Sequence, residues 1–228
     1  TPFILVNASG SPIDLSAYEE QAKAILQVWY PGGEGGRAVA DILFGNAAPQ
    51  GKLPVTFYYN DNRLPEITDY AMKDRTYRYM TQKPWKPFGF GLTYGEAQID
   101  SVQVDVVEGG KESCFVEKKE QGWRVTIADK VFYQRAAEEG LGITVSCSAK
   151  YDTCVSEAVQ LYVHVNGTPN EVPNAKLAAF GRVQIVPDAK TVRRFFIPAN
   201  AFTTVDQNGR RNADGNGADI YIGFSVFI

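Results

Sequence analysis

Cysteine, histidine and long apolar runs are scarce in this 228-residue sequence, and each scarcity excludes a class of protein. Three cysteines are too few for a disulfide framework, and their spacing matches no common zinc pattern. We therefore expect free thiols, although a Cys147–Cys154 pair across a hairpin stays open. Because no run approaches the roughly 18 apolar residues of a membrane span, no membrane partner is expected.

The chain also lacks an excess of one charge: 23 Lys and Arg against 26 Asp and Glu give a net charge of −3. Nucleic-acid binders usually carry a basic face, so no nucleic-acid partner is expected. The composition, 44% hydrophobic and 21% charged, is that of a soluble globular protein that can bury a core. Residues 1–6 lack the basic flank of a signal peptide, so they are expected to be internal. The compartment, cytoplasmic or secreted, stays open.

Near the N-terminus, the segment Trp29–Gly45 joins an apolar run to a short amphipathic helix through a turn made almost entirely of glycine. Phe3–Val6 and Ala24–Tyr30 are the apolar runs of buried parallel strands, and Ser16 can cap a short helix between them that extends to Lys23. A parallel sheet must be covered on both faces, and so few residues cannot cover it. Residues 1–59 are therefore predicted to be the C-terminal portion of a larger α/β sandwich domain.

The glycine turn leads into a predicted helix over residues 36–44, with Gly45 as its C-cap. Gly51–Phe57 then reads as a short strand, and Pro54 places that strand at a sheet edge. Residues 60–95 are polar and rich in proline, yet they carry several aromatic residues, which a disordered linker would not. We expect an ordered connector that lies across the surface of one domain, with its rings buried against a neighbour; the rings are those of Tyr70, Tyr77, Tyr79 and Trp85.

Residues 96–228 show a different pattern, in which short alternating runs are separated by Gly, Pro, Asn and Asp turns. Seven such runs are typical of an antiparallel β-sandwich of immunoglobulin or fibronectin type III architecture. The fold class predicted for the whole chain is therefore α/β plus all-β. The runs are Ile99–Val107, Gly122–Ala128, Gly140–Ser148, Ala158–Val165, Phe180–Val186, Thr191–Ile197 and Ile220–Phe224.

No residue of this sequence is assigned a catalytic, cofactor-binding or metal-ligating role. The glycine turn lacks both the Lys-Ser/Thr of a P-loop and the spacing of a dinucleotide site, and Glu34 puts a carboxylate where a phosphate would sit. His164 is the only histidine, and it stands in an alternating strand, which favours a structural role. Paired carboxylates of a glycosidase must face each other across a sugar, and no spacing here selects such a pair.

Several segments, in the same order, resemble the C-terminal half of glycoside hydrolase family 3, the family of β-glucosidases and β-xylosidases. Two further segments, Val159–Val163 and Lys176–Phe180, are similar to strands of the family's fibronectin-like domain. The segments that carry the rest of the resemblance are Asn7–Leu15, Ala24–Gly36, Ala40–Gly45, Pro49–Phe57, Arg75–Tyr79 and Pro87–Tyr94.

This resemblance implies an enzyme of three parts: a (β/α)-barrel, an α/β sandwich domain and a fibronectin type III-like domain. Its nucleophilic Asp and its acid/base Glu would both lie upstream of Thr1, and Glu34 is interpreted as structural. The expected partners are the barrel-bearing upstream part, as a second chain or a covalent neighbour, and an oligosaccharide substrate; a homo-oligomer stays open. The alternative is a carbohydrate-binding or scaffolding module. The choice between glucose, xylose and arabinose stays open.

Overall fold

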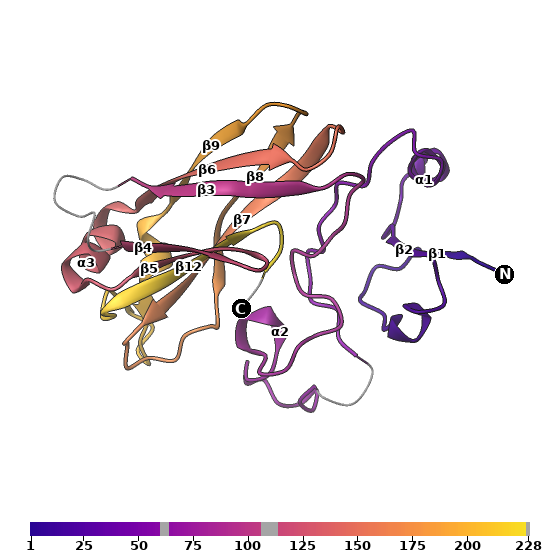
Figure 1. Ribbon diagram of the computed structural model, residues 1–228. Coiled ribbons are helices and arrows are strands. Elements are labelled where there is room, and N and C mark those ends of the chain that lie inside the picture. The colour runs from indigo at the N-terminus through magenta and orange to yellow at the C-terminus, as the bar shows by residue number, and fades with distance from the viewer. Residues whose placement is uncertain (60–63, 106–113, 227–228) are drawn as a thin grey trace. The chain divides into compact units, whose positions relative to one another are not determined.

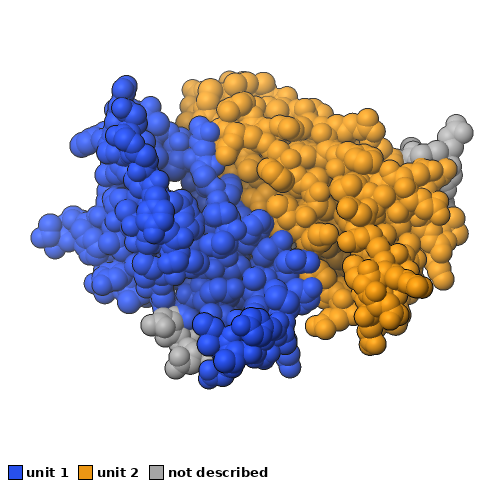
Figure 2. All heavy atoms as spheres, turned by 180° about the vertical axis from the view of Figure 1, so that it is seen from behind, with its two compact units in different colours: residues 1–92 blue, residues 93–228 orange. Residues whose placement is uncertain are grey.

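The computed structural model describes residues 1–59, 64–105 and 114–226. The chain forms two compact units, residues 1–92 and residues 93–228, coloured blue and orange in Figure 2. The predicted division into residues 1–59, 60–95 and 96–228 stays a prediction. None of the described helices is long and apolar enough to cross a membrane.

The first unit contains a two-stranded parallel sheet, in which β1 (Ile4–Asn7) pairs with β2 (Ala24–Gln27) (Figure 1). Between them in the sequence lies a single 3-10 turn, η1 (Ser16–Tyr18). The prediction of a helix extending to Lys23 with a Ser16 cap is therefore wrong. The Ser16 N–H donates instead to the Asp14 carboxylate at 2.9 Å, and the Lys23 N–H donates to the Phe3 carbonyl at 2.8 Å, so Lys23 is hydrogen-bonded to the residue before β1 and not to a helix.

The glycine turn leads into helix α1 (Gly35–Leu43), close to the predicted bounds. Gly45 follows the helix with φ of +79°, and its N–H donates to the Ile42 carbonyl at 3.1 Å, which ends the helix as predicted. The only other described α-helix of this unit is the one-turn α2 (Thr76–Tyr79).

The predicted edge strand Gly51–Phe57 is not a strand. Its backbone pairs with the connector instead: the Leu53 N–H donates to the Phe90 carbonyl at 2.7 Å, and Phe57 forms an isolated antiparallel bridge with Lys86. Pro54 has no N–H to donate, so a continuous ladder through this segment cannot form. The segment therefore fastens the connector to the unit rather than extending the sheet.

The second unit is a sandwich of two antiparallel sheets, as predicted (Figure 1). The three-stranded sheet has the order β3-β6-β9, and the five-stranded sheet has the order β4-β5-β12-β7-β8. Strands β10 (Thr204–Val205) and β11 (Arg211–Asn212) form a small separate hairpin. The sheet strands are β3 (Ala97–Val104), β4 (Cys114–Lys119), β5 (Gly122–Ile127), β6 (Leu141–Ala149), β7 (Val155–Asn166), β8 (Lys176–Ile185), β9 (Thr191–Ile197) and β12 (Gly217–Gly223).

The sandwich core is formed by inward-facing aliphatic side chains of both sheets, centred on residues such as Val125, Ile143 and Ile220, all fully buried. Each of the seven predicted runs overlaps an observed strand, although the last two residues of the run 99–107 lie outside the described residues. Helix α3 (Lys130–Glu139) and the 3-10 helix η2 (Ala199–Phe202) were not predicted. The Asp129 side chain caps α3 by accepting from the Phe132 N–H at 2.7 Å.

Candidate functional site

The most site-like feature of the first unit is the edge where β1 and β2 end. In open α/β sheets, ligands bind outside the carboxyl ends of the parallel strands. Asn7 and Gln27 are the last residues of the two strands, and the Asn7 amide donates to the Gln27 side-chain oxygen at 2.5 Å and to the Ser9 hydroxyl at 2.9 Å. The Gln27 amide donates in turn to the Ser9 carbonyl at 3.0 Å. Three polar side chains therefore meet at this edge.

Beside this polar cluster, the chain leaves β2 through a strained residue. Trp29 adopts φ of +57°, a left-handed conformation that costs a bulky residue free energy. This ends the strand earlier than the predicted Tyr30. The Trp29 ring packs edge-on against Phe57, with the ring centres 6.0 Å apart, which offsets the cost. Glu34 stands at the N-cap position of α1, but its side chain makes no capping hydrogen bond.

A small aromatic cluster joins three separate segments of the first unit, each of which contributes one ring. Phe57 lies between Trp29 and Trp85, and the Trp85 indole N–H donates to the Glu19 carboxylate at 2.8 Å. Lys86 pairs with the same carboxylate at 2.5 Å. These hydrogen bonds, chiefly the one from Lys86, hold the pKa of Glu19 below its usual value. Glu19 is therefore an anionic tether between the 3-10 turn and the connector.

Within the connector, one arginine binds the loop that precedes it in the sequence. The Arg75 guanidinium donates to the carbonyls of Asp69, Glu66 and Ala71 at 2.6, 3.0 and 3.1 Å, and so holds the preceding loop in a fixed shape. Among the aromatic rings of the connector, that of Tyr70 is 91% exposed in this chain. The Trp85 ring is buried within this chain, whereas burial of the Tyr70 ring against a neighbour stays a prediction.

In the second unit, the residues with chemical potential are held in structural roles. His164 lies on β7, with its Nδ1 atom 2.8 Å from the Pro173 carbonyl. All three cysteines are free thiols, as expected. Burial, followed by the Asp100 charge, raises the pKa of Cys147 to about 12, and burial raises the pKa of Cys114 to about 11. Neither thiol is therefore activated as a nucleophile.

Asp219 and Arg124 form an ion pair on the outer face of the five-stranded sheet, and the Asp219 side chain is buried. Asp219 accepts from Arg124 Nε and Nη2 at 3.0 and 2.7 Å, from the Thr126 hydroxyl at 2.8 Å and from the Asn166 amide at 3.0 Å. Burial raises the pKa of Asp219, but the hydrogen bonds from Arg124, Asn166 and Thr126 outweigh burial, and the net pKa lies below its usual value. A carboxylate held ionised in this way is unsuited to donate a proton.

This pair predicts an acid-sensitive second unit. Because the pKa of folded Asp219 is lowered, its stabilising contribution is complete above the unfolded pKa, about 3.9, and is lost as the pH falls through the lower folded value. Urea unfolding followed by circular dichroism from about pH 6 downward should show the free energy of unfolding decreasing below about pH 4. The decrease should be smaller in Asp219→Asn; equal slopes in the two proteins would contradict this role.

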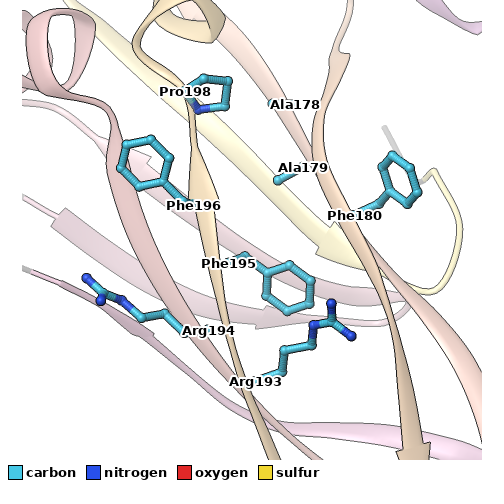
Figure 3. Close-up of a pocket in the computed structure, with 8 residues that line it drawn as sticks. All are labelled: Ala178, Ala179, Phe180, Arg193, Arg194, Phe195, Phe196 and Pro198. Atoms are coloured by element: carbon cyan, nitrogen blue, oxygen red, sulfur yellow. The ribbon is translucent and has the colours of Figure 1, made fainter.

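A shallow depression of about 470 Å³ lies on the second unit between strands β8 and β9, which are edge strands of different sheets (Figure 3). Ala178 is the extra residue of a β-bulge in β8, which breaks the regular alternation there. Figure 3 shows Phe180 and Phe196 pointing to opposite sides of the depression. Its lining residues are Ala178, Ala179, Phe180, Arg193, Arg194, Phe195, Phe196 and Pro198. Among the described residues, no group of three or more His, Cys, Asp or Glu side chains could hold a metal ion.

Comparison with known proteins accounts for both units. The family model "Glycosyl hydrolase family 3 C-terminal domain" matches residues 1–94, and the model "Fibronectin type III-like domain" matches residues 157–226. A xylan 1,4-beta-xylosidase of Xylanibacter ruminicola is 51% identical over 107 residues, which are 47% of this chain and 12% of that protein. A periplasmic beta-glucosidase of Salmonella typhimurium is 27% identical over 237 residues, covering 97% of this chain and 27% of that protein.

Solved structures agree with this fold. The crystal structure of a Bifidobacterium adolescentis GH3 beta-glucosidase superposes on 97% of this chain and 31% of its own, with a TM-score of 0.75 at 23% identity. The chain thus spans about a quarter to a third of the relatives that it matches along nearly its whole length. The C-terminal domain of the family comes first in this chain, and a fibronectin type III-like domain follows it. This chain therefore belongs to glycoside hydrolase family 3 and is the C-terminal part of a protein of that family.

Proposed function

We propose that this chain is the non-catalytic, supporting part of a retaining β-glycosidase that removes terminal β-linked glucose or xylose. The observation that carries the proposal is the uncovered parallel pair β1–β2. Ile4 and Val6 point to one face of this pair and are 46% and 38% exposed, although parallel sheets are otherwise buried on both faces. An apolar face of this kind is stable only when another part of the protein covers it.

The covering part in this proposal is the upstream portion of the same enzyme, which bears the (β/α)-barrel, as a second chain or a covalent neighbour. The chain spans only 27% of the Salmonella relative, and the unmatched remainder of that protein is long enough to hold such a domain. Residues 1–59 would join its α/β sheet, residues 60–95 would be the connector and residues 96–228 the β-sandwich. Retaining hydrolysis needs a nucleophile and an acid/base carboxylate, and both would come from the upstream part.

The test is an activity assay with and without that upstream part. The isolated chain should not hydrolyse aryl β-glucosides or aryl β-xylosides, whereas the chain joined to or mixed with the barrel-bearing part should. Comparing turnover on the two substrates would also decide between glucose and xylose. Turnover by the isolated chain that a single Asp or Glu substitution within it abolishes would contradict the proposal.

A second candidate, a polysaccharide-binding module, is favoured by the depression between β8 and β9, where Phe180 and Phe196 are exposed beside Arg193. Exposed aromatic rings can stack on sugars, and a guanidinium can donate to their hydroxyls. The two candidates differ in the same experiment. If the chain were only a binding module, it would be retained on insoluble xylan or cellulose, and adding the barrel-bearing part would not produce hydrolysis.

A further inference from the structure

The aromatic ring of Tyr30 is exposed to solvent at the carboxyl edge of the parallel pair β1–β2. Tyr30 is 82% exposed, although it lies only three residues after the end of β2 and directly before the glycine turn. A Cβ atom on Gly10 would lie 2.4 to 2.6 Å from atoms of the Tyr30 ring, so the ring lies directly against the bare backbone of Gly10. One side of the ring is thus supported, and the rest is accessible.

The backbone that carries this ring is held in place on both sides. Trp29, the preceding residue, is packed against Phe57. On the other side, a Cβ atom on Gly35 would lie 2.4 Å from the ring of Pro31, and the Gly35 N–H donates to the Gly32 carbonyl at 2.9 Å, so Pro31 packs against the start of α1. A ring with a fixed backbone and few rotatable bonds loses little entropy when a ligand stacks on it.

The polar cluster of Asn7, Ser9 and Gln27 lies at the same edge as this ring, because Gly10 and Tyr30 each follow three residues after the end of their strand. An aromatic surface beside amide and hydroxyl groups is suited to a pyranose ring, whose apolar C–H face stacks while its hydroxyls form hydrogen bonds. The carboxyl edge of parallel strands is also where α/β sheets bind their ligands.

We propose that Tyr30 is a sugar-contacting residue that stacks on a pyranose unit of the β-linked substrate, at the carboxyl edge of β1–β2 where this chain would border the active site. This inference rests on the function proposed above. Gly10 is the positioning residue, because only a residue without a side chain lets the Tyr30 ring lie against the backbone there.

The test uses the chain joined to its barrel-bearing upstream part and measures kcat and KM on a β-linked disaccharide. Tyr30→Ala should raise KM about threefold to tenfold, the loss of one aromatic stacking contact, while Tyr30→Phe should stay within about twofold because it keeps the ring. Gly10→Ala should raise KM in the same direction by displacing the ring, since Gly10 is not in a left-handed conformation and tolerates alanine. Tyr70→Ala, a change of an equally exposed tyrosine away from this edge, is the matched control and should leave KM unchanged.

The two proposals fail in different ways. A joined wild-type protein that assembles but hydrolyses no β-glycoside contradicts the proposed function. An active wild-type enzyme whose KM is the same in Tyr30→Ala overturns only the role of Tyr30. Loss of association with the upstream part in Tyr30→Ala, detected by size-exclusion chromatography, also overturns it, because the ring would then be an interface residue.

Discussion

Replacing Asp219 by alanine should lower the free energy of unfolding of the second unit by about 3 kcal/mol. The substitution leaves Arg124, whose side chain is only 33% exposed, without its bidentate partner. It also removes the acceptor of the Thr126 hydroxyl and of the Asn166 amide. Losing one partner of a buried pair costs more than the pair itself contributes, because the remaining charge and donors stay partly desolvated.

Urea unfolding near pH 7, followed by circular dichroism, measures this change. Glu117→Gln is the matched control, since Glu117 lies 3.9 Å from the same guanidinium but is exposed, and it should cost less than about 0.5 kcal/mol. A cost below about 1 kcal/mol for Asp219→Ala would show that solvent compensates Arg124, and that this network does not hold β12 to β5.

Replacing Phe57 by alanine should destabilise the first unit by about 3 kcal/mol. Phe57 is only 2% exposed and lies between the rings of Trp29 and Trp85, so its removal leaves a cavity between the end of β2 and the connector. The strained Trp29 backbone would also lose the packing that offsets its conformational cost.

Hydrogen exchange followed by mass spectrometry measures this effect in the chain itself. Amides that link the two segments, such as those of Phe57 and Lys86, should exchange about a hundredfold faster, as expected for a loss of about 3 kcal/mol. Val55→Ala lies in the same segment, at a more exposed position, and serves as the control. Equal exchange in both variants would mean that the aromatic cluster does not support this unit.

Seven strands of the second unit could be predicted because each carries its own signal. β9 (Thr191–Ile197) has the predicted bounds, since it is rich in β-branched and aromatic residues and is flanked by the turn residues Pro187 and Asp188 before it and Pro198 after it. β4 (Cys114–Lys119) was not predicted, because it is an edge strand with mostly exposed residues and therefore lacks an alternating pattern. Helix α3 was not predicted either: its mixed polar and apolar sequence shows little periodicity, and its cap at Asp129 was overlooked.

The candidate site was largely beyond prediction. The glycine turn was recognised in the sequence, but nothing local indicated that the Tyr30 ring lies against Gly10, twenty positions earlier. The polar cluster joins Asn7 to Gln27 in the same way, and only the pairing of β1 with β2 brings them together. One rule could indicate this site from the sequence: ligands bind at the carboxyl ends of parallel strands, which points to the residues that follow the two predicted strands.

The sequence alone determined the fold class and the family, because strand alternation, turn residues and the ordered series of motifs are local features that survive without knowledge of contacts. The tertiary structure decided which residues meet. It bonds the Gly51–Phe57 segment to the connector where an edge strand was expected, pairs Asp219 with Arg124 and brings Asn7 next to Gln27. These are long-range outcomes, set by packing and by hydrogen bonds between distant segments, and no local pattern encodes them.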